Sequence, residues 1–204
     1  MTPDAWNPGM NASDSQRLRI SNVEESIHNM LTMICPVSNP GIEETPDRVA
    51  RMWINELTTG YDVDIASLFR LFPDEDYKGM VIVKDIPVRS VCEHHLVPII
   101  GYAHLAYFPS KYIIGLSKLA RVVDAYSRRL QVQERLTQQI HAAIDTYMEP
   151  RGAIVTIEAE HMCMTIRGVQ APGTRTVTSE ASGLFIEEDG VKDEFFELIS
   201  RNNH

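Results

Sequence analysis

The segment 91–98 constrains this chain more than any other, because it places a thiol, a carboxylate and two imidazoles in four consecutive residues, Cys92 to His95. The apolar residues on both sides are typical of a strand, and polar groups in a buried strand are costly unless something pairs with them. Cys92 and His95 are close enough in sequence to bind one metal ion. A catalytic zinc site usually has three protein ligands and one water, so a third ligand is expected elsewhere in the chain.

A second cluster, His161-Met162-Cys163, offers a candidate for that third ligand. The chain contains 3 cysteines, and two thiolate ligands favour zinc over magnesium or calcium. The alternative is that both clusters are ordinary core residues, because a lone Cys or His on an apolar strand usually is one. The zinc interpretation assigns three ligands and, beside them, two proton carriers: Cys92, His95 and Cys163, then His94 and His161.

The composition is that of an ordinary globular chain, and it restricts the possible partners. Of 204 residues, 44% are hydrophobic and 23% are charged, and the net charge of −9 argues against a broad nucleic-acid-binding surface. The longest apolar runs are far shorter than the roughly 20 residues of a membrane-spanning helix. Residues Met1 to Asp4 show neither the basic start nor the apolar core of a signal peptide. An odd number of cysteines without such a signal predicts reduced thiols and a cytoplasmic location.

Helices are expected in the N-terminal third of the chain. Residues 1–14 are rich in Asn, Ser, Pro and Asp and are expected to be disordered. The helical spacing of apolar residues predicts a first helix over 15–34. A second helix is expected to begin at Thr45-Pro46, with Thr45 as its N-cap. We therefore assign residues 15–77 to an N-terminal helical region.

From residue 78 onward the pattern changes, and it defines a second predicted domain over 78–204. Runs of apolar and β-branched residues predict strands over 80–88, 96–108, 153–160 and 174–185. Helical spacing predicts helices that begin near 115, cover 132–148 and cover 191–199. Paired strands separated by a pair of helices predict an α+β domain, with an antiparallel sheet covered by helices on one face.

Two pairs of basic residues are candidates for binding an anion. Lys118 and Arg121 share one face at the start of a helix whose expected N-cap is Ser117, and a helix N-terminus favours phosphate. Arg48 and Arg51 also share a helix face, although a solvated surface is the simpler explanation of that segment by itself.

Glu134 lies in the first turn of the helix over 132–148, next to Gln133. Its charge complements the helix dipole, a contribution of up to about 1 kcal/mol. The alternative is that Glu134 accepts two hydrogen bonds from a planar pair of donors, such as the ring nitrogen and amino group of guanine. Its position alone favours the dipole explanation.

Four motifs of the chain together resemble the zinc-dependent, type I GTP cyclohydrolases. They are Ser90-Val91-Cys92-Glu93-His94-His95, Gly115-Leu116-Ser117-Lys118-Leu119-Ala120-Arg121, Gln131-Val132-Gln133-Glu134-Arg135-Leu136, and His161-Met162-Cys163-Met164 with Arg167-Gly168. The segment Thr45 to Ala50 is also similar, and the match runs from about Ile42 to Phe185 without large gaps. Arg51 stands where some members of the family have Lys, and no role is assigned to Arg89.

The resemblance implies the tunnelling fold, in which subunits form rings of five and two rings stack into a homodecamer with active sites between subunits. It also implies the reaction, in which GTP and water give 7,8-dihydroneopterin triphosphate and formate, the first step of tetrahydrofolate or a related pterin biosynthesis. Zinc would activate the water that attacks carbon 8 of guanine, since zinc lowers the pKa of bound water to about 7. Ring opening, ribose rearrangement and closure of the pterin ring would follow.

The same resemblance implies roles for individual residues. It supports Cys92, His95 and Cys163 as metal ligands, with His94 and His161 as the proton-transfer pair. The substrate contacts that it implies are Glu134 and Gln133 for guanine, Ser117 (grouped with the catalytic residues), Lys118, Arg121 and Arg167 for ribose and triphosphate, and Arg48 and Arg51 for phosphate from a neighbouring subunit. Two other classes stay open. A structural zinc protein would need a fourth protein ligand, and a binding module would hold a purine or pterin without turnover.

Overall fold

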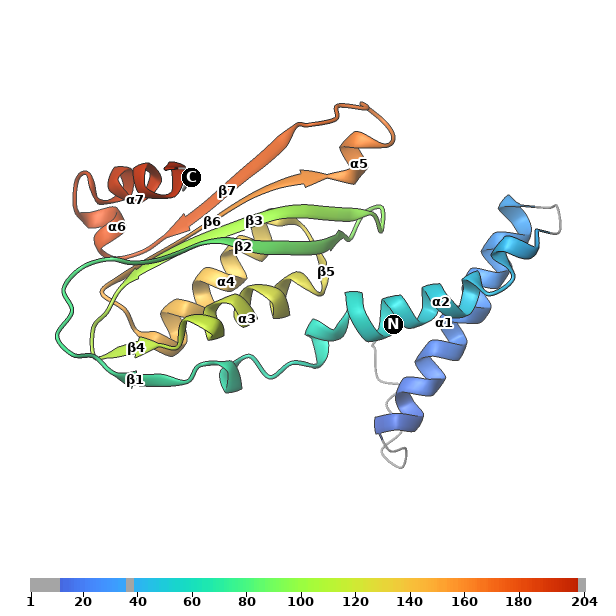
Figure 1. Ribbon diagram of the computed structural model, residues 1–204, viewed down its shortest axis with the longest axis horizontal. Coiled ribbons are helices and arrows are strands. Elements are labelled where there is room, and N and C mark those ends of the chain that lie inside the picture. The colour runs from blue at the N-terminus through green and yellow to red at the C-terminus, as the bar shows by residue number, and fades with distance from the viewer. Residues whose placement is uncertain (1–11, 36–38, 202–204) are drawn as a thin grey trace. The chain divides into compact units, whose positions relative to one another are not determined.

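The computed structural model describes residues 12–35 and 39–201, which divide into two compact units, one ending at Thr59 and one beginning at Gly60. The first unit contains helices α1 (Ala12–Ile34) and α2 (Thr45–Met52), which pack against each other (Figure 1). A 3-10 turn, η1 (Pro40–Ile42), precedes α2, and a π-helical turn, η2 (Trp53–Leu57), follows it. The buried residues of this segment are Pro46 and Ala50 of α2 and Ile54 of η2.

The structure changes two details of the predicted N-terminal region. Helix α1 begins at Ala12, so residues 12–14 are helical, while residues 1–11 of the segment expected to be disordered lie outside the described residues. Thr45 is the first helical residue and Glu44 occupies the N-cap, which makes the predicted cap wrong by one position.

The second unit begins earlier than the domain boundary predicted after residue 77. The stretch just before this boundary, up to residue 77, contains two 3-10 turns, η3 (Thr59–Asp62) and η4 (Ala66–Leu68), and strand β1 (Leu71–Pro73). Its apolar side chains Ile65, Leu68 and Phe69 pack against the core of the sheet, which is why the stretch belongs to the second unit. Strand β1 pairs antiparallel with β4 (Tyr112–Ile114) in a small sheet of its own.

A five-stranded sheet with the order β5-β2-β3-β6-β7 forms the centre of this unit (Figure 1). Its strands are β2 (Val81–Cys92), β3 (Pro98–Phe108), β5 (Leu130–Gln131), β6 (Gly152–His161) and β7 (Arg175–Ala181). Neighbours are antiparallel, except that the short β5 runs parallel to the end of β2. The register of β2 shifts between Val83 and Ile86, where Asp85 adopts a left-handed φ of 60°.

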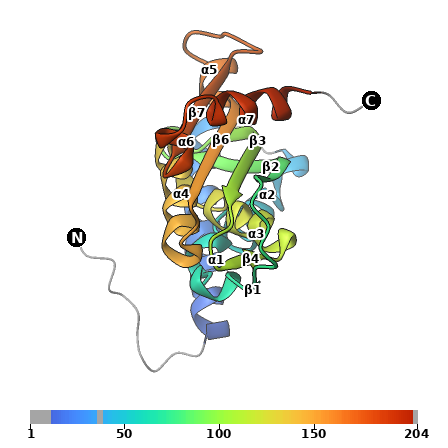
Figure 2. The ribbon, with the colours of Figure 1, turned by 90° about the vertical axis from the view of Figure 1, so that its left-hand side faces the viewer.

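Helices α3 (Leu116–Ser127) and α4 (Gln133–Met148) cover one face of the sheet, and their apolar residues close the main core (Figures 1 and 2). Alternation along the strands explains this core, because Ala103, Leu105 and Tyr107 of β3 point to one face. The short helices α6 (Leu184–Glu187) and α7 (Val191–Ser200) pack against the other face, on Ala106 and Ile154.

The predicted fold class, an α+β domain built on an antiparallel sheet, is confirmed. The expectation that helices cover one face only is wrong, because the apolar side chains of α6 and α7 pack on the second face. The strand predicted over 174–185 ends at Ala181, because Gly183 has a positive φ of 53° and turns the chain into α6. Among residues 12–35 and 39–201, no helix combines the length and the hydropathy that crossing a membrane requires.

Candidate active site

A tight turn between β2 and β3 carries the first candidate metal ligands. The N–H of Cys92 donates to the carbonyl of Val97 at 2.9 Å, and the N–H of Leu96 donates to the carbonyl of Cys92 at 2.8 Å. Leu96 adopts a left-handed φ of 56°, which closes the turn. Cys92 is buried at the end of β2, whereas His94 and His95 are exposed on the turn.

The third candidate ligand reaches this turn through the pairing of β3 with β6. Ile99 at the start of β3 lies opposite His161 at the end of β6, and Cys163 follows in the short helix α5 (Met162–Thr165). Glu160 holds the segment after β6, because its carboxylate accepts hydrogen bonds from the Thr165 hydroxyl and the Gly173 N–H. The ligand atoms of Cys92, His95 and Cys163 consequently lie within 4.8 Å of one another.

The chemistry of this group fits a thiophilic metal ion. Burial raises the pKa of the Cys163 thiol, and the neighbouring Cys92 thiol raises it further. A cation between the two sulfur atoms would remove this opposition to ionisation, and zinc accepts two thiolates and an imidazole. In the part of the chain that the structure describes, no fourth Cys, His, Asp or Glu joins the group.

Arg167 lies beside the candidate ligands. Its Nη1 is 3.1 Å from Nε2 of His95, and since a guanidinium only donates, that ring nitrogen accepts. This contact places a positive charge next to the three ligand groups, as an anionic substrate would require.

His161 is held from the other side by Gln133, the first residue of α4. Its Nε2 lies 2.7 Å from Oε1 of Gln133, and Gln133 itself exposes only 1% of its surface. Burial lowers the pKa of His161, and Glu134 acts in the opposite direction. Glu134 is exposed at the surface of the same helical turn.

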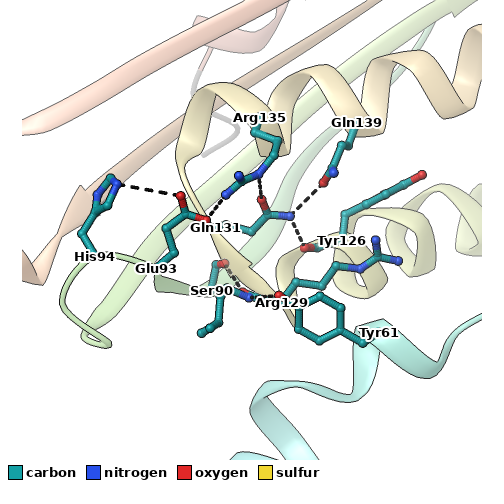
Figure 3. A network of polar contacts seen from close by, with 10 residues as sticks. Tyr61, Ser90, Glu93, His94, Tyr126, Arg129, Gln131, Arg135 and Gln139 are labelled. Atoms are coloured by element: carbon teal, nitrogen blue, oxygen red, sulfur yellow. Dashed lines mark hydrogen bonds and ion pairs between the residues drawn. The ribbon is translucent and has the colours of Figure 1, made fainter. Parts of the chain in front are cut away.

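A polar network behind the turn was not predicted from the sequence (Figure 3). Glu93 forms an ion pair with Arg135 of α4, and its other carboxylate oxygen lies 3.8 Å from Nε2 of His94. The Nε of Arg135 also donates to Gln131, whose amide in turn donates to Gln139 at 2.9 Å and to the carbonyl of Tyr126 at 2.9 Å.

The N–H of Glu93 donates to the carbonyl of Gln131 at 3.0 Å, so the turn is bound to β5 by its backbone as well. The signal for this network was present in the sequence. A carboxylate next to a buried cysteine that is a candidate ligand needs a partner, and Arg135 stands in one of the four motifs.

The other predicted substrate-binding residues lie on helices α3 and α2. Helix α3 begins at Leu116 with Gly115 as N-cap, so Ser117 lies in the first turn and the prediction that it caps the helix is wrong. Lys118 and Arg121 follow on α3, and neither forms an ion pair with another described residue. Arg48 and Arg51 belong to the N-terminal unit, where each pairs with the carboxylate four positions before it.

A family model and the similar curated proteins all point to the same family. The model of the GTP cyclohydrolase I family matches residues 23–200. A GTP cyclohydrolase 1 of Parabacteroides distasonis is 49% identical over 168 residues, covering 81% of this chain and 85% of the relative. The GTP cyclohydrolase 1 of Bartonella henselae is 45% identical over 94% of this chain and 93% of its own length, and that of Rattus norvegicus is 45% identical over 96% and 82%. The chain thus belongs to the GTP cyclohydrolase I family.

Proposed function

We propose that this chain converts GTP and water into 7,8-dihydroneopterin triphosphate and formate, the first step of tetrahydrofolate or a related pterin biosynthesis. The observation that carries the proposal is the convergence of Cys92, His95 and Cys163 within 4.8 Å, in a chain of this family. A structural zinc site would need a fourth protein ligand. Within the described residues the group has three, which supports a catalytic centre.

Zinc is the metal that we assign to this group, held by Cys92, His95 and Cys163. When bound, zinc supplies Lewis-acid activation of water at neutral pH. Both thiols must stay reduced to act as ligands, and this supports a cytoplasmic location for the protein.

Two imidazoles of the chain stand beside the ligands and can move protons. Opening the imidazole ring of guanine requires a proton at nitrogen 7, and histidine titrates close to working pH. His161 is fixed through Nε2 by Gln133, so Nδ1 is the ring atom left for proton exchange with the substrate. His94 is exposed and contacts the Glu93 carboxylate, which suits it to exchange protons with solvent.

We assign recognition of GTP to polar and basic side chains that are not buried. The exposed carboxylate of Glu134 can accept hydrogen bonds from the ring N–H and the amino group of guanine. The ribose and triphosphate contacts are assigned to Ser117, Lys118 and Arg121 on α3, together with Arg167 beside the candidate ligands. Arg48 and Arg51 would have to leave their carboxylate partners to bind phosphate, and we keep them as contacts from a neighbouring subunit.

A homodecamer of two stacked five-membered rings is part of the same proposal. Exposed apolar side chains on the sheet face opposite α3 and α4 support burial between subunits. Tyr102 of β3 and Val177 of β7 are both paired with Glu158, so they lie on one face, and they are 47% and 58% exposed. Closing a ring also covers the edge strands of the sheet.

The test is turnover by the zinc-loaded protein. Incubation with GTP should release formate and a product that becomes a fluorescent pterin after oxidation, in equal amounts. ATP serves as the control, because adenine lacks the ring N–H and amino group at the matching edge. Zinc-loaded protein that binds GTP but releases no formate would refute the proposed activity and favour a binding module.

A further inference from the structure

The side chain of Gln133 is enclosed between α4 and the two strands β6 and β7. Its amide nitrogen lies 2.9 Å from the carbonyl oxygen of Ile157 on β6 and 2.9 Å from that of Thr176 on β7. The Thr178 hydroxyl is a third neighbour at 3.1 Å. Gln133 therefore spans three elements of the fold although it is the first residue of its helix.

These contacts determine which way the amide group is oriented. Carbonyl oxygens only accept hydrogen bonds, so the group that faces Ile157 and Thr176 must be the NH2 of the amide. The reverse orientation would place three oxygen atoms against one another in a buried site. Oε1 consequently faces His161 and accepts from its Nε2 at 2.7 Å.

Two threonines close the arrangement around Gln133. The Thr137 hydroxyl donates to the backbone carbonyl of Gln133 at 2.9 Å, which leaves the Thr178 hydroxyl to donate to Thr137 at 2.6 Å. Thr178 can then accept from the Gln133 amide. Thr137 is 2% exposed and Gln133 is 1% exposed, so rotation of this amide would leave buried polar groups without partners.

We infer that Gln133 is a positioning residue for His161: it fixes the ring orientation and the Nε2–H tautomer and makes no contact with the guanine base. The inference rests on the proposed function for the role of His161, and it replaces the expectation that Gln133 binds guanine. Both amide hydrogens are used by β6 and β7, and the buried Oε1 is used by His161. Glu134, one residue later and exposed, is left as the base contact.

The first test measures the tautomer directly in the zinc-loaded wild-type protein. Magic-angle-spinning NMR of protein with 15N-labelled histidine separates the protonated from the bare ring nitrogens, and the His161 signals are assigned by their loss in His161→Ala. We expect a hydrogen on Nε2 and a bare Nδ1. A bare Nε2 with the hydrogen on Nδ1 would overturn the inference. This result does not depend on turnover, so it stands even if the protein releases no formate from GTP.

The second test separates positioning from base contact by kinetics. Gln133→Met keeps the length of the side chain but cannot accept from His161, and Thr178→Val removes a hydroxyl from the same cluster without touching His161. For Gln133→Met we expect kcat to fall about 10- to 100-fold, which is no more than the roughly 100-fold minimum that a general acid contributes, because the residue positions the acid and does not replace it. KM for GTP should stay within about threefold. Thr178→Val should keep both constants within about threefold.

Zinc content should stay at the wild-type level in both variants. A Gln133→Met variant with unchanged kcat and a strongly raised KM would show that Gln133 binds the base, and unchanged values of both constants would exclude any positioning role. A Gln133→Met protein that does not fold leaves the tautomer measurement as the deciding result.

Discussion

The antiparallel pair of β3 and β6 has two ends of very different character. At the end where Ile99 faces His161, the neighbouring side chains are polar and are held by directional hydrogen bonds and ion pairs. At the end where Phe108 faces Gly152, the neighbours are aromatic. Phe108 and Phe185 have ring centroids 5.2 Å apart, and Phe185 and Phe195 meet edge to face at 6.2 Å.

The difference shows that the paired strands β3 and β6 stabilise the fold at one end and position the candidate metal site at the other. The aromatic end is complete in itself, since Phe185 and Phe195 are 2% and 0% exposed. The polar end keeps His94 and His95 exposed and gathers the three candidate ligand atoms within 4.8 Å of one another. Substitutions at the polar end should therefore change metal binding and activity, and substitutions at the aromatic end should change stability.

The largest effect is expected for Cys163→Ser, which removes one of the three proposed zinc ligands from the polar end. The variant should lose bound zinc and all detectable GTP turnover, because two remaining ligands do not make a zinc site. Metal analysis by mass spectrometry checks this result. Cys35→Ser, in the N-terminal unit, is the matched control and should keep its zinc. Stoichiometric zinc in Cys163→Ser would remove this residue from the ligand set.

Phe195→Ala tests the aromatic end and should lower the free energy of unfolding by about 3–5 kcal/mol, since it leaves a cavity where a fully buried ring packed. Urea denaturation followed by circular dichroism measures the loss. Phe196→Ala is the control, because this ring is only partly buried and should cost less. The zinc content and kcat of the folded protein should not change. If zinc were lost while stability stayed the same, the two ends would not be independent.

Glu134→Gln returns to the polar end and should weaken GTP binding by about 2 kcal/mol, the scale of a lost hydrogen bond to a charged group. Titration of GTP and ATP into zinc-loaded protein measures the effect, and ATP binding should change little. Zinc content should be unaffected, because Glu134 is not part of the ligand group. GTP binding equal to that of the wild type would mean that Glu134 only complements the helix dipole.

The smallest effect is expected for Arg135→Met, which removes the partner of Glu93 behind the turn. Groups that orient ligands typically change metal affinity by about 10- to 100-fold, and this partly exposed pair should fall at the lower end. Competition with a chromogenic chelator measures zinc affinity. Arg175→Met, on β7, breaks an exposed ion pair with Glu158 of β6 and should leave the zinc affinity unchanged. Equal affinities in the two variants would argue against a role for the network in holding the turn.

The sequence predicted the architecture well, because the alternation and helical spacing of apolar residues survive in the structure as buried faces. The two Cys/His clusters could be joined on the basis of ligand chemistry, and β3 brings them together by pairing with both β2 and β6. The placement of α7 on the opposite face could not be predicted, because its apolar stripe fits either side of a sheet.

The environment of Gln133 was equally hidden in the sequence. It depends on the carbonyls of Ile157 and Thr176, and backbone groups are the same for every sequence. From the chain alone, a Gln beside Glu134 is therefore naturally assigned to the substrate. The predicted N-cap of α3 was wrong because residue type alone does not fix where a helix starts. Ser117 is a good capping residue, but the helix begins one residue earlier, at Leu116.

The distance in sequence between the turn and α5 has a consequence for the topology of the chain. A metal ion bound by both Cys92 and Cys163 would cross-link the chain into a loop of roughly 70 residues. Closing a loop of this length lowers the conformational entropy of the unfolded chain. That loop contains β3, α3, α4 and all of β6, which together make up nearly the whole main core. In the proposed zinc-bound protein, the ion would therefore also act as a reversible cross-link, and the cell's supply of metal would influence the lifetime of the folded chain as well as its chemistry.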